Sequence, residues 1–299
     1  MKFDLIATNP PFQDTTRRGK TPHKLWIEFT KKAFSNWLEQ DGYLAQVSPS
    51  SFRSPNSPIL DLIKERQTEF INFDTETYFP KVGSSFAHYV IRNAPRPQDH
   101  ATIIVAKGNK FEHELHEEII YLPNVLEAAD FGIHEKVMFR PRTRLDVRWD
   151  YVTCHNIRIH DSDSLSRERS LKHNCPVLHT NKQIWWSSKQ QEFAAKKKVM
   201  WSRSGYTKPF YDRGQLGGTD MAYYVLVPTA KAGVRLEKIL NLSLFRYIYT
   251  TAKWSGFGNE RVFRLLPGVP DDVEPSDSGV FEYFELTQEE VSRVLEIVE

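Results

Sequence analysis

The residues whose types and spacing can do chemistry stand in the stretch FDLIATNPPFQD, residues 3–14. Its apolar run FDLIA predicts a buried strand, which ends where Pro10 and Pro11 supply no backbone donors. The amide oxygen of Asn9 and the carbonyl of Pro10 can together accept two hydrogen bonds from one planar aromatic amine. Those bonds localise the lone pair of the amine and make it nucleophilic without a strong base. Phe12 can stack on the ring that carries the amine.

The elements around this stretch predict the layered sheet that would position it. Apolar residues recur at helical spacing from 25 to 37, and the segment GYLAQVSP reads as a second strand ended by a proline. Residues 58–67 read as a helix, and FINFDT and FAHYVIRN read as two further strands. Strands that alternate with helices over short connections are typical of an α/β fold with a parallel sheet.

A proline-rich polar segment, NAPRPQD, which we call the seam, follows these elements and marks a change in amino-acid composition along the chain. Beyond it the sequence is irregular, aromatic and basic, with strand-like pieces in ATIIVAK and MAYYVLVP and helical patterns at 230–240 and 288–298. The seam is a typical linker composition. We therefore expect two domains, at residues 1–95 and 96–299.

The ordered set of motifs resembles the N6-adenine-specific DNA methyltransferases, whose catalytic motif is Asn-Pro-Pro-Phe or Asn-Pro-Pro-Tyr and is followed by a target-recognition region. The resemblance is clear from 3 to 93 and looser later, where KVMWSRSGYTKPFYD and TTAKWSGF look like recognition-domain segments. It implies a partial Rossmann-like methyltransferase sheet in the catalytic half, followed by a mixed α+β target-recognition domain.

The resemblance also implies a role for each residue of the motif. Asn9 and the Pro10 carbonyl would hold the adenine amino group, with Pro11 completing the motif and Phe12 stacking on the base. Phe86, in GSSFAHYV, matches the second aromatic residue of the family, which packs against the same base. Because adenine inside a duplex is out of reach, such enzymes rotate it out of the stack. The alternation in SFAHYVI also fits an ordinary core role for Phe86.

The family requires S-adenosylmethionine, which it binds through a glycine-rich loop and an acidic residue that precede the Asn-Pro-Pro-Phe motif. Only eight residues precede Asn9 here, and the best later candidate, SGFGNERV with Gly256 and Gly258, reads rather as a basic aromatic turn. We therefore expect the cofactor site to come from a second polypeptide or a missing N-terminal half. A split enzyme, a truncated enzyme and a binding protein with an inactive catalytic domain all remain open.

The charge of the chain is unevenly distributed, although the formal net charge is only +2. Residues 180–213 carry a local charge of +6, and residues 270–299 carry −9. Lysine and arginine neutralise phosphates and read guanine, and aromatic side chains stack on bases. We therefore expect double-stranded DNA as the partner of the second domain. The candidate contact residues are Arg140, Arg142, Arg144, Lys182, Trp185, Lys197, Arg203 and Lys208, within a wider set that includes Arg148, Trp186, Trp201, Tyr206 and Tyr211.

Cysteine and histidine residues gather between Cys154 and His179, which raises the question of a metal site. Their spacings match no standard zinc finger, and we expect no metal there. Two cysteines in the whole chain suit a reducing cytoplasm, and no apolar run is long enough for a membrane span. These features predict a soluble intracellular protein, and the resemblance implies the cytoplasm of a bacterial or phage-infected cell.

The function that these observations predict is site-specific DNA adenine-N6 methylation in a restriction-modification or phage setting. A non-catalytic DNA-binding specificity subunit is the first alternative. An amino-methyltransferase that acts on RNA or on protein glutamine is the second alternative, because enzymes that catalyse those reactions also use an Asn-Pro-Pro-Phe motif.

Overall fold

A computed structural model of the chain describes residues 2–13, 24–79, 85–124, 127–150, 164–180, 183–203, 208–252 and 260–299. These residues form two compact units, each of which is described by itself. The first unit contains residues 1–135 and 251–258, and the second contains 136–250 and 259–299. None of the helices in the described parts is long and apolar enough to cross a membrane.

The first unit is built on a six-stranded sheet with the order β1-β2-β4-β3-β5-β6. β1 runs parallel to β2, and β3 runs parallel to β5, but β4 runs antiparallel between β2 and β3. The strands are β1 (Phe3–Thr8), β2 (Leu38–Pro49), β3 (Arg66–Asn72), β4 (Phe86–Pro95), β5 (Ala101–Ala106) and β6 (Asn109–Glu114).

The expectation of a parallel sheet is therefore wrong in part, since the sheet is mixed. Parallel neighbours need a crossover, usually through an α-helix, whereas antiparallel neighbours need only a turn. Between β3 and β4 the described chain forms only the 3-10 turn η3 (Asp74–Tyr78). β5 and β6 are joined by Lys107 and Gly108, both at positive φ, which is the geometry of a tight hairpin.

The proline-rich seam at 95–97 does not end the sheet. β5, which follows the seam, adds to β3 in parallel through the pairs Phe70 with Ile103 and Ile71 with Ile104. Backbone hydrogen bonds between these strands thus hold the chain on both sides of the seam in one layer. The first unit accordingly extends beyond residue 95 to Glu135.

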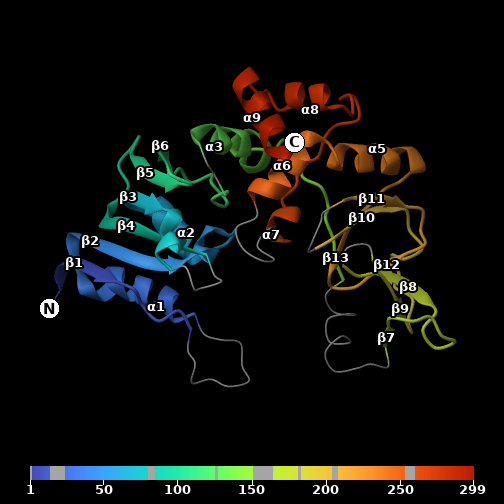
Figure 1. Ribbon diagram of the computed structural model, residues 1–299, viewed down its shortest axis with the longest axis horizontal. Helices are drawn as coiled ribbons and strands as arrows, with labels where there is room; N and C mark the ends of the chain where they lie inside the picture. The colour runs from blue at the N-terminus through green and yellow to red at the C-terminus, as the bar shows by residue number, and fades with distance from the viewer. Residues whose placement is uncertain are drawn as a thin grey trace. The chain divides into compact units, whose positions relative to one another are not determined.

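Short helices accompany the sheet, and two of them, α1 and α2, begin at the residues where the sequence patterns predict helices. α2 starts with Pro58 at its first position, where the missing amide costs no hydrogen bond, and it buries Ile59, Leu60 and Ile63. Figure 1 shows α1 lying beside β1 and β2. The helical elements of this unit are α1 (Leu25–Lys32) with its π-helical end η1 (Ala33–Trp37), η2 (Ser50–Arg53), α2 (Pro58–Glu65), α3 (Ala128–His134) and the start of η4 (Glu135–Phe139).

A buried polar network ties α1 to the sheet. The amide nitrogen Nε2 of Gln46 on β2 lies 2.8 Å from Oγ1 of Thr30 on α1 and 3.0 Å from the hydroxyl of Tyr89 on β4. Burial raises the pKa of Tyr89 to about 12, so the phenol stays protonated. The network holds α1 against the strands whose ends carry the candidate site.

The second unit contains two small sheets and several helices. One sheet has the order β11-β10-β13 and is antiparallel, and the other has the order β12-β8-β9-β7. The strands are β7 (Leu165–Ser166), β8 (Cys175–Leu178), β9 (Ile184–Ser187), β10 (Lys198–Ser202), β11 (Phe210–Asp212), β12 (Gly217–Gly218) and β13 (Ala222–Leu226). The helices are α5 (Ala230–Leu240), α6 (Ser243–Thr251), α7 (Glu260–Phe263), α8 (Asp277–Tyr283) and α9 (Gln288–Val298). The last residue of α6, Thr251, belongs to the first unit.

The acidic end of the chain is folded into α8 and α9. Thr287 and Glu290 form a capping box at the start of α9, in which each side chain accepts a hydrogen bond from the backbone amide of the other residue. Glu290 also forms an ion pair with Lys136, with 2.7 Å between Oε2 and Nζ. The helices predicted at 230–240 and 288–298 are both confirmed.

Candidate functional site

Three parts of the chain that are far apart in sequence meet at one edge of the first sheet. β1 ends at Thr8, which pairs with Gln46 near the end of β2. β2 itself ends at Pro49, which pairs with Phe86 at the start of β4. The carboxyl ends of the parallel strands β1 and β2 and the start of the antiparallel β4 therefore share one edge. In α/β sheets, ligands bind outside the carboxyl ends of the strands.

The Asn-Pro-Pro-Phe segment leaves β1 at this edge. Pro10 is buried, whereas Asn9 and Pro11 are exposed and Phe12 is half-buried. Among the described residues no hydrogen bond reaches the Pro10 carbonyl oxygen or the Asn9 side chain. The ring of Pro10 fixes the backbone here, and the hydrogen bonds of the described residues leave both acceptors unused.

An aromatic cluster adjoins the segment. The ring of Phe12 lies 5.3 Å from that of Phe86, centroid to centroid, with 30° between the planes, and Phe79 lies 5.4 Å from Phe86. At this spacing Phe12 and Phe86 are in direct contact, which leaves no room for a base between them. A base that stacks on Phe12 would take the ring face turned away from Phe86, with Phe86 supporting Phe12 from behind.

Phe79 is the residue of this cluster that the sequence patterns did not single out. It sits in TETYFP, where nothing in its spacing separates it from an ordinary loop aromatic. Nearby, His88 Nδ1 lies 2.8 Å from Oγ1 of Thr75, and burial lowers the pKa of His88. His88 is therefore neutral at pH 7 and adds no positive charge to this edge of the sheet.

The described residues do not form a cofactor site of the kind that S-adenosylmethionine requires. A glycine-rich turn at a strand end lets the backbone approach a nucleotide closely, and an acidic residue holds the ribose. Here β1 is followed by Asn9 and β2 by Ser50, while Gly108 belongs to a hairpin between β5 and β6. β5 is parallel to β3 and leads into Gly108, but that turn returns the chain as the antiparallel strand β6 and does not open a helix.

The arginines predicted to contact DNA differ in the contacts that their side chains make within the protein. Arg142 is exposed, 3.4 Å from Oε1 of Glu285 and 5.4 Å from the ring of Tyr283. Arg144 donates hydrogen bonds to the carbonyl oxygens of Met138 and Leu265, and so ties three chain segments together. Arg148 is paired with the neighbouring Asp146, and Arg140 is exposed.

The candidates farther along the chain are also spread over several environments. Trp185 is half-buried and stacks on His179 with 4.1 Å between ring centroids, and Arg203 is half-buried. Lys197 and Lys208 are exposed. Lys182, Tyr206 and the glycines Gly256 and Gly258 lie outside the described residues.

Trp201 is a correction to the wider set of surface aromatics. Its side chain is 1% exposed and packs against Tyr223 and Phe263 in the interior of the second unit. All five residues of β10 are buried, so β10 is an interior strand although the sequence around it is rich in basic and aromatic residues. The physical reason is that both faces of β10 are covered: Met200 packs with Leu178 and Phe193, and Trp201 packs against Phe263.

Two arginines that the sequence analysis passed over lie against tryptophan rings. Arg167 is 5.4 Å from the ring of Trp185, and Arg169 is 5.3 Å from that of Trp186. Trp185 and Trp186 are consecutive residues of β9 and so point to opposite faces of that strand, and nothing in the spacing of SRERS indicated these two contacts. Arginines stacked on tryptophans form one of the surfaces on which bases or phosphates can lie.

The cysteine and histidine cluster is only partly described. Cys154, His155 and His160 lie outside the described residues. His179 is buried, with Nδ1 2.9 Å from Oγ1 of Thr219, and the ring of His173 contacts Ser170. Within the described residues no group of three or more metal-ligating side chains comes together.

No protein-family model matches the chain, and no curated protein matches its sequence. It is similar to solved structures of MmeI, a type IIL restriction-modification enzyme in complex with DNA (10% identity, TM-score 0.47), and of the type IIG restriction endonuclease BpuSI (10%, 0.29). It is also similar to LlaBIII, an ATP-dependent type ISP restriction-modification enzyme bound to DNA (8%, 0.42).

These matches cover 98%, 93% and 98% of this chain but only 54%, 44% and 30% of MmeI, BpuSI and LlaBIII. The chain thus spans about half or less of the length of each enzyme. With every TM-score below 0.5, these likenesses carry no conclusion about what the chain does, and the case for its function rests on its own residues.

Proposed function

We propose that this chain carries the catalytic motif and the target-recognition region of a DNA adenine-N6 methyltransferase. The observation that carries the proposal is the meeting of Asn9, Phe12 and Phe86 at the carboxyl edge of β1 and β2. Two open acceptors and a partly exposed aromatic ring are what a planar aromatic amine needs for recognition. The adenine amino group, presented on a flipped base, has that shape and chemistry.

In this proposal, Asn9 and Pro10 act on the amine directly. The two N–H groups of the adenine amine donate to Oδ1 of Asn9 and to the Pro10 carbonyl oxygen, which concentrates electron density on nitrogen. Phe12 replaces part of the stacking that the base loses when it leaves the duplex. S-adenosylmethionine supplies the methyl group of the proposed reaction, and its binding residues lie outside those described in this chain.

The open side of β1 is where we propose that the cofactor-binding half adds to the sheet. Among the strands that the structure describes, β1 and β6 lie at the two edges of this sheet. β6 carries Lys110, Glu112 and Glu114, charges of the kind that discourage pairing at an edge, whereas β1 exposes Phe3 and Leu5. A strand with exposed apolar side chains and a free row of backbone groups favours a further strand beside it, from a preceding segment or a second polypeptide.

The experiment compares wild type with Asn9→Ala for adenine methylation in the cells in which the protein naturally occurs, where the proposed cofactor-binding half is supplied. Labelled methyl groups are counted in DNA, RNA and protein, and N6-methyladenine is mapped in the DNA. We expect sequence-specific N6-methyladenine that disappears with Asn9→Ala. Asn36→Ala, at another exposed asparagine of the same unit, is the matched control and should leave methylation unchanged.

Each other outcome has a defined meaning. Methylation that persists in Asn9→Ala would contradict the assigned role of Asn9. Label in RNA or in protein, but not in DNA, would replace the DNA substrate by one of those two. DNA binding by the purified chain with no methylation in the producing cells would favour the non-catalytic specificity subunit.

A further inference from the structure

A hollow on the second unit gathers three cationic side chains. Its volume is about 640 Å³, and Lys196, Lys197 and Arg213 line it together with an apolar floor formed by 226–228. The three cations come from two segments, one before β10 and one after β11. We call this feature the Lys197 hollow.

The charge of the Lys197 hollow is only partly balanced. Lys196 forms an ion pair with Glu192, with 2.8 Å between Nζ and Oε1. Lys197 and Arg213 are exposed, and neither has a carboxylate within ion-pair distance among the described residues. The hollow therefore presents two uncompensated positive charges to whatever enters it.

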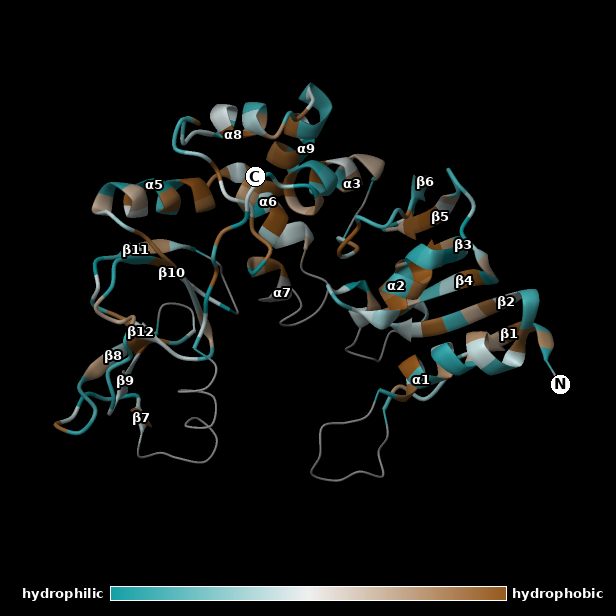
Figure 2. Cartoon of the chain, turned by 180° about the vertical axis from the view of Figure 1, so that it is seen from behind, coloured by the Kyte–Doolittle hydropathy of each residue, from teal (hydrophilic) through white to brown (hydrophobic). Residues whose placement is uncertain are grey.

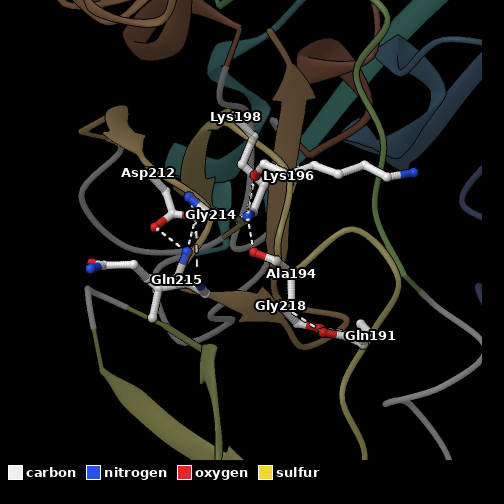
Figure 3. Close-up of polar contacts among 9 residues, drawn as sticks. Gln191, Ala194, Lys196, Lys198, Asp212, Gly214, Gln215 and Gly218 are labelled. Carbon is white, nitrogen blue, oxygen red and sulfur yellow. Dashed lines mark hydrogen bonds and ion pairs between the residues drawn. The ribbon is translucent and has the colours of Figure 1, made fainter. Parts of the chain in front are cut away.

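A buried ion pair holds the two segments in place. The ammonium nitrogen of Lys198 lies 2.6 Å from Oδ2 of Asp212, and the two side chains are 0% and 3% exposed. Lys198 also donates to the carbonyl oxygens of Ala194 and Lys196, each at 2.9 Å. Figure 3 shows these contacts with Lys198 at their centre. The segment that carries Lys196 and Lys197 is thus bonded to the end of β11.

Asp212 organises the second segment. Its carboxylate accepts backbone hydrogen bonds from Gly214 at 3.2 Å and from Gln215 at 3.1 Å, which fixes the turn that starts at Arg213. Gly214 has a φ of +100°, and a Cβ placed on it would lie 2.5 Å from the carbonyl oxygen of Ala195. This close approach brings the two segments together along their backbones.

Gln191 anchors the other end of the first segment. Its amide group exchanges two hydrogen bonds of 2.8 Å with the backbone of Gly218 on β12. Phe193, two residues later, is buried and stacks on Tyr224 with 4.1 Å between centroids. With both ends of the 192–197 segment fixed, its lysines are presented from a rigid support. Preorganised cations lose less entropy when they bind than cations on a mobile loop.

We propose that the Lys197 hollow binds a backbone phosphate of duplex DNA. Lys197 and Arg213 would contact the phosphodiester oxygens, and the apolar floor at 226–228 would lie against the adjoining sugar. Such a contact positions the protein on the duplex and carries no sequence information by itself. The inference rests on the proposed function, whose DNA substrate it extends with a defined subsite.

The test is the salt dependence of DNA binding by the full chain. The association constant for a duplex oligonucleotide is measured by fluorescence anisotropy over a range of salt concentrations, for wild type, Lys197→Gln and Arg213→Gln. Each lost phosphate contact is expected to lower the slope of log K against log salt by about 0.9. Because both cations serve one phosphate, we expect a partial loss of slope in each single variant and the full loss of about 0.9 in the double variant.

Lys110→Gln is the matched control. It removes the same single positive charge, but from an exposed position on β6 of the first unit. It should leave the slope unchanged. The proposed subsite is overturned if wild type binds duplex DNA and the Lys197 and Arg213 variants keep its slope, a result that leaves the proposed function standing. If wild type does not bind duplex DNA at all, both proposals fail together. A slope that falls equally in Lys110→Gln would also overturn the subsite, since net charge alone would then explain it.

Discussion

Glycine at position 214 is required by geometry that can be tested against a second glycine. Gly214 and Gly108 both have positive φ, +100° and +80°. A Cβ on Gly108 would meet nothing within 4 Å, whereas one on Gly214 would lie 2.5 Å from the carbonyl oxygen of Ala195. The two positions therefore share the backbone strain and differ in the steric clash.

We expect Gly108→Ala to lower the free energy of unfolding by about 1 kcal/mol and Gly214→Ala to lower it by about 3 kcal/mol, the difference being the clash with Ala195. Urea unfolding followed by circular dichroism measures both values. Equal losses for the two variants would show that the segments at Ala195 and Gly214 separate without cost.

Single residues also mark the limit of what the sequence predicts. Asn9, Phe12 and Phe86 could be found from motif order, and the sheet does bring them to one edge. Lys198 could not be separated from Lys196 and Lys197 in the run KKK, although it alone is buried. Which lysine of such a run points inward depends on a carboxylate 14 positions away, and local sequence does not contain that information.

At the scale of elements, the Lys198–Asp212 pair joins β10 to β11 and the turn that follows. Removing one partner of a buried ion pair leaves the other charge without compensation in the interior. We therefore expect Lys198→Met to lower the free energy of unfolding by about 3–5 kcal/mol. Thermal or urea unfolding of the purified variant measures the loss.

The double variant Lys198→Met/Asp212→Leu is the control for charge. It removes the uncompensated carboxylate, so it should recover part of the loss. Recovery should be incomplete, because Asp212 also accepts the backbone hydrogen bonds of Gly214 and Gln215. A single variant as stable as wild type would show that the pair is not a stabilising element.

A second element-scale prediction concerns Glu135 at the start of η4. Its Oε1 lies 2.7 Å from Nε2 of His116 and 3.3 Å from Nε2 of His113 on β6. Burial by itself raises the pKa of Glu135, but the hydrogen bonds and charge of the two histidines outweigh it and lower the pKa from 4.5 to about 2. The carboxylate thus links η4 to β6 and the segment after it.

The sign of the pH effect follows from this lowered pKa. A carboxylate with a pKa lower in the folded than in the unfolded state stabilises the fold above about pH 4.5, and that contribution disappears as the pH falls toward 2. Glu135→Gln should therefore flatten the pH dependence of stability between pH 4.5 and 2, measured by urea unfolding. Glu117→Gln, at an exposed position, is the control and should leave the dependence unchanged.

Two predicted helices of the second unit, α5 and α9, have capping residues at their starts, whereas the capped helices α3 and α8 were not predicted. α5 begins after Thr229 and α9 after Thr287, and in each case the threonine hydroxyl accepts a backbone hydrogen bond of the first turn. The direction of β4 could not be predicted, because strand periodicity is the same in parallel and antiparallel sheets. Pairing of β4 with β2 and β3 on both sides decides it, and that pairing is a long-range property.

At the scale of the whole molecule, the two edges of the first sheet are treated differently. Figure 2 shows β5 largely brown and its neighbour β6 teal, in keeping with a charged outer strand. At the opposite edge, Phe3 and Leu5 on β1 are 44% and 61% exposed. Exposed apolar side chains on an edge strand with one described neighbour form a surface that favours pairing with another strand.

We therefore expect the purified chain to self-associate through β1 when no other polypeptide covers that edge. Leu5→Lys places a charge on the strand and should reduce the association, because burying an ammonium group in a strand interface is unfavourable. Val234→Lys is the matched control, since Val234 is 57% exposed but lies on α5, where no backbone groups are open for pairing. Sedimentation velocity over a range of protein concentrations measures the association. Equal suppression by both variants would assign it to general surface hydrophobicity, and no suppression by Leu5→Lys would remove β1 as the site at which a further strand adds.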